Sequence, residues 1–380
     1  MSRRPRAADF EAEESPPEAD RLEGHAHPRE TYDLFGQADA ERELATAFAS
    51  GRMHHAWLLT GREGIGKATL AYRLARAALA TLAERSAIPA GSLAVSAGTI
   101  VAKQVQALSH PGLMVIRRPW SRENKRLAQV ITIDEVRRLK GFLQHSAGEG
   151  AYRVVIIDRA EDMNTSAANA LLKSLEEPPQ RTVFLLVSSE PGRLLPTIHS
   201  RCRRLALKRL GEADLAAAVT AAGVALPPAR QMQLITSLAD GSVRRTFELI
   251  AGDAIDLHGK IVGLLSRLPQ VDYEAVHKLA ESAGAHGADQ DFQSFFSLLS
   301  DLLARALRAQ VTGTPLPEGE AEVARRLVPE GSSPARLATW ARLWETIVRE
   351  KAEVQAINLD RKAFIVDTFR RFEAAAGAAD

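Results

Sequence analysis

Cysteine and long apolar runs are both scarce in this chain. Its 380 residues include one cysteine, Cys202, which excludes an internal disulfide and a cysteine-rich zinc site. Unpaired thiols are typical of a reducing compartment, so we expect a cytoplasmic protein. No run of ~20 apolar residues is present, and no membrane span is expected. The N-terminus has arginines but no apolar core behind them, so we expect no secretory signal.

Neither sign of charge dominates. The chain has 49 Lys and Arg residues against 47 Asp and Glu residues, a formal net charge of +2. It is therefore no polycation, and any contact with nucleic acid must come from local patches. Apolar residues make up 46% and charged residues 25%, a balance that excludes wholesale disorder, collagen and a coiled-coil rod. The length predicts about two or three domains.

Four segments differ in their residue patterns. Residues 1–30 are rich in arginine, acids and proline and have few bulky apolar side chains, so we predict a disordered tail. Residues 31–207 alternate between strand and helix patterns. Residues 208–254 have helical patterns only, and so do residues 255–380, where aromatic and leucine side chains recur at helical spacing. These patterns predict an α/β part followed by all-α parts.

The α/β part contains candidate strands at residues 56–60, 113–117, 153–158 and 182–188. The last two include the continuous apolar runs VVII and VFLLV, which suit strands that are buried on both faces. Such runs predict a parallel sheet between two layers of helices. Helices are expected at residues 67–80, 165–177, 212–223 and 229–239.

A glycine-rich turn follows the first candidate strand and opens the first of these helices. Residues 61–67 read Gly-Arg-Glu-Gly-Ile-Gly-Lys, in the strand–turn–helix context that a phosphate-binding P-loop requires. Glycines let backbone amides approach phosphate oxygens, the helix N-terminus adds a favourable dipole, and Lys67 can neutralise the β- and γ-phosphates. The turn is therefore compatible with bound ATP or ADP. The residues expected to contact the nucleotide are Gly61, Gly64, Ile65, Gly66, Lys67, Ala68, Thr69, Asp158 and Arg244.

Two groups that drive ATP hydrolysis are missing from this pattern. The residue after the P-loop lysine is Ala68, whose methyl cannot ligate Mg²⁺, and the hydroxyl of Thr69 is turned by ~100° around the helix. Asp158 ends a candidate strand, but the acidic residue that would follow it and orient water is replaced by Arg159. Glu161 comes two residues later and is expected in the loop. The sequence predicts a site that is vestigial or binds nucleotide without turnover, and no metal site.

Two arginines outside the turn have more than one interpretation. Arg201 is a surface charge unless the chain lies beside another nucleotide-binding subunit, whose γ-phosphate a guanidinium can then reach. Arg244 opens a helix and could face a nucleotide bound at Lys67. Cys202 is expected to be a small buried core residue and not a nucleophile. Basic residues also gather at 117–126, where a solvated loop explains them better than a nucleic-acid site does.

Taken together, the motifs resemble those of one family. Residues 164–179, NTSAANALLKSLEEPP, resemble the AANALLKxLEEPP motif of bacterial DNA polymerase III clamp-loader subunits. The run Ser-Arg-Cys at 200–202 follows in the same order as in those subunits. Ser188 or Ser189 falls at their first sensor position, and residues 241–244 resemble their second sensor motif.

The resemblance covers roughly residues 31–372 and implies the domain arrangement of that family. It implies an AAA+ P-loop domain of RecA-like fold at 31–207, a small helical lid at 208–254 and a helical collar for oligomerisation at 255–380. The expected fold class is thus α/β plus all-α. Many relatives carry a four-cysteine zinc module after the P-loop helix, but residues 81–112 contain no cysteine, so no zinc is expected.

Within this family, the incomplete phosphate site favours the delta-prime type of subunit over the ATP-hydrolysing gamma/tau type. The resemblance implies a stator with little or no ATPase activity of its own, in a hetero-pentameric ring with delta and gamma/tau subunits. Arg201 would act in trans on the ATP of the neighbouring motor subunit. Primed DNA and the sliding clamp would be reached through the complex, which is part of the DNA polymerase III holoenzyme at the replisome.

Two alternatives stay open. The first is a self-sufficient AAA+ clamp-loader ATPase of the gamma/tau type, which Lys67 and Asp158 favour and which Ala68 and Arg159 oppose. The second is a nucleic-acid binder that acts alone through the basic residues at 117–126.

Overall fold

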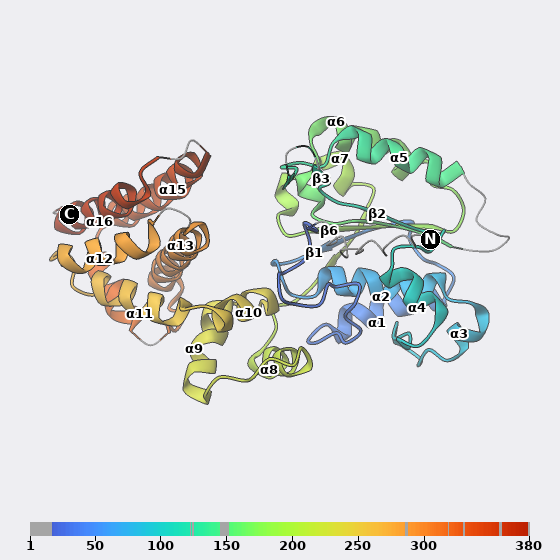
Figure 1. Ribbon diagram of the computed structural model, residues 1–380, viewed down its shortest axis with the longest axis horizontal. Coiled ribbons are helices and arrows are strands. Elements are labelled where there is room, and N and C mark those ends of the chain that lie inside the picture. The colour runs from blue at the N-terminus through green and yellow to red at the C-terminus, as the bar shows by residue number, and fades with distance from the viewer. Residues whose placement is uncertain are drawn as a thin grey trace, which may run out of the picture. The chain divides into compact units, whose positions relative to one another are not determined.

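The computed structural model describes residues 17–121, 123, 125–144, 152–285, 288–317, 319–329, 331–356 and 359–378 (Figure 1). The chain divides into two compact units. The first comprises the residues up to Val224 together with Ser242–Arg244, and the second comprises Ala225–Gly241 and the residues from Arg245 onwards. The boundaries at 207 and 254 that separate the three predicted domains stay predictions.

The first unit contains the strands and a series of short and medium helices. Its elements are α1 (Ala38–Ala49), β1 (Ala56–Thr60), α2 (Lys67–Leu79), α3 (Leu82–Ser86), α4 (Ile100–Gln106), β2 (Leu113–Ile116), β3 (Trp120–Ser121), β4 (Arg126–Leu127), α5 (Ile133–Gln144), β5 (Arg153–Ile157), the 3-10 helix η1 (Ala160–Asp162), α6 (Thr165–Glu176), β6 (Thr182–Ser188), the 3-10 helix η2 (Pro191–Arg193), α7 (Pro196–His199), β7 (Arg203–Ala206) and α8 (Glu212–Ala221).

In the rest of the described chain, the elements of regular secondary structure are all helices. They are α9 (Ala229–Ala239), α10 (Val243–Ala251), α11 (Ala254–Leu265), α12 (Tyr273–Ala283), α13 (Asp289–Thr312), α14 (Glu320–Leu327), α15 (Pro334–Ala356) and α16 (Arg361–Gly377). None of the helices in the described residues is both long enough and apolar enough to span a bilayer. The fold class, α/β plus all-α, is confirmed.

A parallel sheet of five strands organises the first unit. Its strand order is β2-β5-β6-β1-β7, and every neighbouring pair is parallel. The four strands predicted from apolar runs are confirmed, with β1 and β6 at the predicted bounds. The fifth strand, β7, was not predicted. It lies at the sheet edge with one neighbour and exposes both of its arginines, so it has no continuous apolar run that would reveal it.

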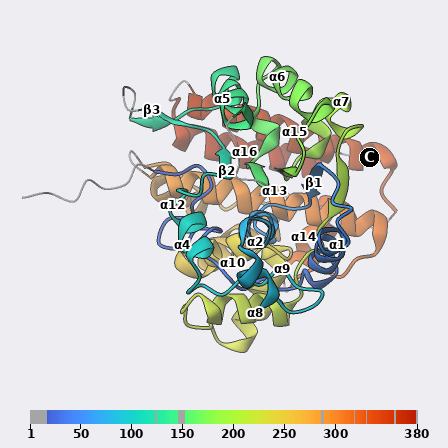
Figure 2. The same cartoon turned by 90° about the vertical axis from the view of Figure 1, so that its right-hand side faces the viewer.

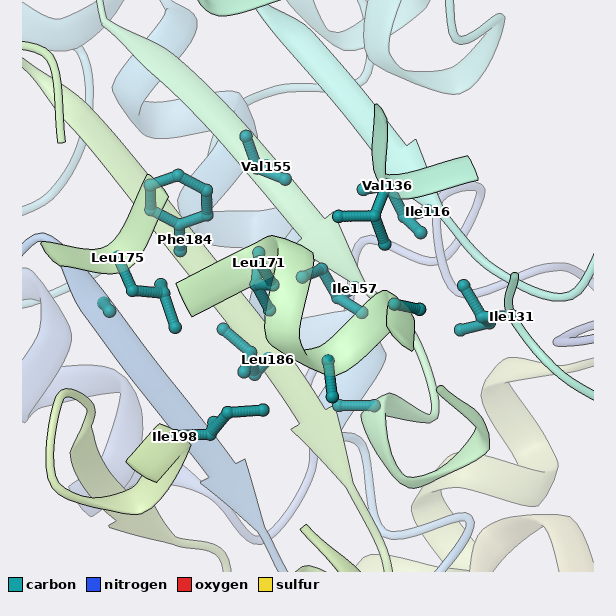
Figure 3. Packing of buried hydrophobic residues seen from close by; sticks show 14 of the residues in the cluster. Ile116, Ile131, Val136, Val155, Ile157, Leu171, Leu175, Phe184, Leu186 and Ile198 are labelled. Atoms are coloured by element: carbon teal, nitrogen blue, oxygen red, sulfur yellow. The ribbon is translucent and has the colours of Figure 1, made fainter. Parts of the chain in front are cut away.

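Helices cover both faces of this sheet. Figure 1 shows α5, α6 and α7 on one face and α1, α2 and α4 on the other, and Figure 2 shows the same two layers from the side. Side chains of β5 and β6 such as Ile157, Phe184 and Leu186 point toward Leu171 and Leu175 of α6 in a fully buried cluster (Figure 3). Because both faces are covered, the inner strands are apolar throughout rather than alternating.

The second unit is held by aromatic packing. Phe292, Phe295 and Phe296 of α13 lie against Phe364 and Phe369 of α16, and the rings of Phe296 and Phe364 are stacked with centroids 4.9 Å apart. All but Phe364 are almost completely buried. These side chains are core residues, because aromatic side chains at helical spacing fill the interface between helices.

The disordered tail predicted for residues 1–30 is wrong for its second half, while residues 1–16 lie outside the described residues. His27 is completely buried, and its Nε2 lies 2.9 Å from Oδ2 of Asp20. Arg117, at the end of β2, contacts Oδ1 of Asp20 at 2.7 Å and also the carboxylate of Glu18, which accepts a further bond from Arg29 at 2.8 Å. A charged segment can be ordered here because each buried charge meets one of opposite sign.

Candidate nucleotide site and the Arg201 surface

The glycine loop between β1 and α2 has the backbone shape that its sequence requires. Gly61, Gly64 and Gly66 all have positive φ, at 139°, 77° and 99°. A Cβ on Gly64 would lie 2.3 Å from Oγ of Ser242, so only glycine fits there. The Gly64 carbonyl accepts a hydrogen bond from the amide of Val243 at 2.9 Å. The segment that carries Arg244 is therefore packed directly on the loop, and the contact of Arg244 with a nucleotide stays a prediction.

The position of Lys67 is fixed by its own loop. Its side chain is buried, and Nζ donates to the carbonyls of Gly61 at 2.7 Å and Arg62 at 2.5 Å and to Oγ of Ser189 at 3.0 Å. Burial lowers the pKa of the Lys67 ammonium to about 8, although nearby carboxylates oppose this shift. Ser189 thus reaches the site as its position after β6 suggested. Ala68 and Thr69 follow in the first turn of α2 and are half-buried.

Gln37, which the sequence did not single out, also holds the glycine loop in place. Gln37 is buried, and its Nε2 donates to the carbonyl of Ile65 at 3.1 Å and to that of Lys208 at 2.7 Å. Its Oε1 accepts from the amide of Lys208 at 3.1 Å. One amide side chain therefore joins the phosphate loop to the segment that leaves β7. An isolated glutamine before a helix carries no sequence signal for such a role.

Asp158 follows β5 and is buried beside the loop. Its backbone amide donates to Ile116 at 2.9 Å, which holds the residue at the carboxyl end of the sheet. Burial raises the pKa of its carboxyl group to about 7, and the negative charge of Asp20 adds to this shift, whereas Arg159 and Lys67 oppose it. The carboxyl group of Asp158 is therefore poorly charged near neutral pH.

Glu161 was expected in a loop, and this expectation is wrong. It lies in the 3-10 helix η1 and is buried, and its Oε1 accepts a hydrogen bond from the amide of Ser189 at 3.0 Å. Its charge acts on both Lys67 and Asp158. The tight turn after Asp158, which begins with Arg159 at φ 51°, folds back and returns Glu161 to the site. The separation of three residues between Asp158 and Glu161 in the sequence does not predict that the Glu161 side chain lies at the site.

A second residue that the sequence did not single out is Glu63. Its Oε1 lies 2.9 Å from Nη1 of Arg159 and 3.7 Å from Nη1 of Arg244. Arg159 also donates from Nε to Oδ2 of Asp162 at 3.1 Å. Arg159, the residue that replaces the expected acid, is thus held between Glu63 of the loop and Asp162 of η1.

Arg201 lies on the surface at the end of α7. Its Nη1 donates to the carbonyl of Thr197 at 2.9 Å and to Oγ of Ser200 at 3.2 Å, and its Nη2 donates to Oε1 of Glu176 at 2.5 Å. Its side chain is 32% exposed. Cys202 is half-buried and packs against the core cluster, and burial raises the pKa of its thiol to about 12. A thiol with this pKa is a poor nucleophile.

The basic loop at 117–126 is not simply solvated. Arg117 pairs with Asp20 and Glu18, and Nε of Arg118 lies 3.1 Å from Oδ2 of Asp162. The expectation of a solvated loop is therefore wrong for these two arginines, because both are held by carboxylates of the same unit. Within the described residues, no group of three or more His, Cys, Asp or Glu side chains could hold a metal ion.

The sheet and the loop together define a class. A parallel sheet with a glycine loop between β1 and α2, a buried lysine at its end and an aspartate after β5 is a P-loop unit. Residues 36–211 match the family described as "DNA polymerase III, delta subunit". The chain is thus a relative of bacterial DNA polymerase III subunits, and the resemblance drawn from its motifs is confirmed.

The most similar relatives include two kinds of subunit. The DNA polymerase III subunit delta' of Pseudomonas aeruginosa is 41% identical over 191 residues, which are 50% of this chain and 53% of that protein. The gamma/tau subunit of Mycobacterium bovis is 30% identical over 287 residues, 72% of this chain and 46% of that protein. The chain therefore spans about half the length of the curated relatives that it matches.

Solved structures also match. A DNA polymerase III gamma subunit-related protein from Thermotoga maritima aligns over 90% of this chain and 99% of its own length, with 18% identity and a TM-score of 0.41. The RuvB Holliday junction branch migration motor of the same organism aligns over 79% of this chain and 88% of its own length, with 17% identity and a TM-score of 0.37.

Proposed function

We propose that this chain is a clamp-loader subunit of the delta-prime type in DNA polymerase III. In this proposal it is a stator of a hetero-pentameric ring, in which it supplies Arg201 in trans to the ATP of a neighbouring gamma/tau motor subunit. The ring, together with the delta subunit, loads the sliding clamp onto primed DNA. The 41% identity to a delta' subunit over 191 residues supports this proposal, and the geometry of Arg201 is the observation on which it rests.

Arg201 has the features of a guanidinium that is held for a ligand outside its own chain. It is oriented by three hydrogen bonds that it donates to Thr197, Ser200 and Glu176, yet about a third of the side chain stays exposed. Its Nε makes no hydrogen bond to any residue in the described part of the chain. An oriented planar fork with a free donor suits an incoming phosphate, whose transition-state charge it can stabilise.

The phosphate site of the chain itself fits binding better than hydrolysis. Gly61, Gly64, Ile65 and Gly66 form the backbone cradle, Lys67 lies at its end, and Arg244 is packed beside it. These residues would hold the phosphates of ATP or ADP, whose chemistry is to supply a transferable phosphoryl group. Ala68 offers no oxygen to Mg²⁺, and the carboxyl group of Asp158 is only partly charged near pH 7 because of its burial. The chain's own groups therefore favour nucleotide binding without turnover.

Reconstitution tests the trans role. The full chain is mixed with clamp-loader partner subunits of its own organism, as wild type, Arg201→Ala and the control Arg193→Ala, whose arginine is an exposed ion-pair partner nearby. We expect Arg201→Ala to assemble normally but to lower the DNA-stimulated ATPase by roughly tenfold or more, while the control leaves it unchanged. An unaltered ATPase in the assembled Arg201→Ala ring would refute the trans role.

A second candidate is a self-sufficient ATPase of the gamma/tau type, which Glu161 favours. Its Oε2 is buried and has no hydrogen-bond partner in the described residues, and it lies beside Lys67 and Asp158. Such a carboxylate could orient a water molecule. Steady-state phosphate release by the isolated chain distinguishes the two candidates: turnover that disappears in both Lys67→Ala and Glu161→Gln would establish this second function.

A further inference from the structure

Glu63 places a carboxylate beside two arginines at the phosphate loop. Its Oε1 lies 2.9 Å from Nη1 of Arg159 and 3.7 Å from Nη1 of Arg244. Among the charged neighbours of Lys67, it is also the one that acts most strongly on the pKa of that ammonium group. Lys67, Arg159 and Arg244 therefore all interact with the Glu63 carboxylate, in addition to their other partners.

The sign of this charge decides its effect on a ligand. P-loops bind phosphate because backbone amides, a helix N-terminus and a lysine together make a positive site. A phosphate that enters here must either draw Arg159 and Arg244 away from Glu63 or bind beside a charge of its own sign. Both routes cost free energy, and the first breaks charge-assisted contacts. The Glu63 side chain is 48% exposed, so it has room to turn outward.

We propose that Glu63 is an internal counter-anion, which takes the electrostatic place of a nucleotide phosphate and keeps the affinity of this loop for nucleoside di- and triphosphates low. This inference rests on the proposed ability of the loop to bind nucleotide, and it identifies the residue that sets the strength of binding. Neutralising Glu63 removes one anionic partner from both Arg159 and Arg244. The nucleotide, in turn, displaces Glu63 from these arginines.

A purely structural role for Glu63 predicts the opposite outcome. If its ion pairs only hold Arg244 against the loop, their loss disorders the cradle and weakens binding. The substitution Glu63→Gln separates the two roles, because the amide keeps the size and an acceptor oxygen of the carboxylate and loses only the charge. Glu43→Gln is the matched control, since Glu43 is a similarly exposed glutamate whose Oε1 lies 2.7 Å from Nη2 of Arg203.

Titration of the full-length chain with fluorescent mant-ADP and mant-ATP at low salt tests the proposal. We expect Glu63→Gln to bind roughly tenfold more tightly than wild type, because one repulsive charge is removed at a partly screened site. Glu43→Gln should bind like wild type. The double variant Glu63→Gln with Lys67→Ala should lose the gain, which assigns it to the loop. Added NaCl should narrow the difference between wild type and Glu63→Gln.

Three outcomes overturn the proposal: binding by Glu63→Gln that is equal to or weaker than that of wild type, a gain that survives Lys67→Ala, or no binding by either protein. The reconstitution with Arg201→Ala measures the ATPase of the neighbouring subunit, and it does not require nucleotide to be bound in this loop. The two experiments can therefore distinguish a wrong inference about Glu63 from a wrong proposal for the function of the chain.

Discussion

Replacing Arg117 by leucine should release the segment at residues 17–30 from the P-loop unit. The guanidinium contacts the carboxylates of Glu18 and Asp20, whose side chains are 16% and 3% exposed. Removing one partner of a buried ion pair costs ~3–5 kcal/mol when the remaining charge is left alone. Here Glu18 keeps Arg29 and Asp20 keeps His27. We therefore expect a smaller loss than this range, roughly 2–3 kcal/mol.

Hydrogen exchange of peptides that cover residues 17–33 measures this loss locally. A destabilisation of that size should speed the exchange of their protected amides by roughly 30- to 150-fold. Arg193→Leu is the control, because it removes an exposed ion pair with Glu190 and should change exchange little. Exchange in Arg117→Leu that stays within about threefold of wild type would show that the buried charges do not hold the segment.

Three further substitutions should have measurable effects on stability or on the reconstituted ATPase. Asp158→Asn should raise the melting temperature at pH 8. Burial moves the pKa of this carboxyl from 3.8 to about 7, so its ionisation costs an upper bound of roughly 4 kcal/mol above pH 7, and the gain should fade as the pH falls from 7 toward 4. Gly64→Ala should lower the free energy of unfolding by roughly 2–3 kcal/mol in a urea titration, because its Cβ would overlap Ser242. Glu176→Gln should leave ring assembly intact but partly lower the reconstituted ATPase, since it removes the charged partner that orients Arg201.

Each of these predictions has its own control. An equal gain from Asp158→Asn at pH 5 and pH 8 would contradict the pKa argument. Gly223→Ala has a similar φ of 73° but open space around the added Cβ, so it should cost only about 1 kcal/mol. A cost for Gly64→Ala no larger than that of Gly223→Ala would contradict the steric argument. For Glu176→Gln, an ATPase equal to that of wild type beside a defective Arg201→Ala ring would show that the ion pair is dispensable.

Prediction from the sequence was most successful where one local signal sufficed. Apolar segments predicted four strands, and those of β5 and β6 are continuous runs because a strand buried on both faces must be apolar at every position. The edge strand β7 was not predicted, because an exposed edge strand with two arginines has the residue pattern of a loop. The helix before Pro178 and Pro179 was predicted to within one residue, since its apolar face, its end and its cap are all local features.

In the candidate site, too, residues with a local sequence signal were predicted and residues that depend on distant partners were not. The glycine loop, Lys67 and Asp158 were predicted because the phosphate loop is a contiguous motif and the aspartate ends a recognisable strand. Gln37, Glu63 and Glu161 were missed or misplaced. Each acts through partners distant in sequence, such as Lys208, Arg244 and Ser189, and pairings of this kind leave no periodic or compositional trace.

The amino-acid sequence by itself determined the class of fold, the glycine loop and the presence of Ala68 and Arg159 beside Lys67 and Asp158, because all of these depend on the identity of neighbouring residues. Only the tertiary structure decided which charges meet. It buried Asp20 and His27 against Arg117, turned Arg159 toward Glu63 and returned Glu161 to Lys67. The free energy of a charge depends on its distance from other charges and from water, and the folded chain, rather than the order of residues, sets both.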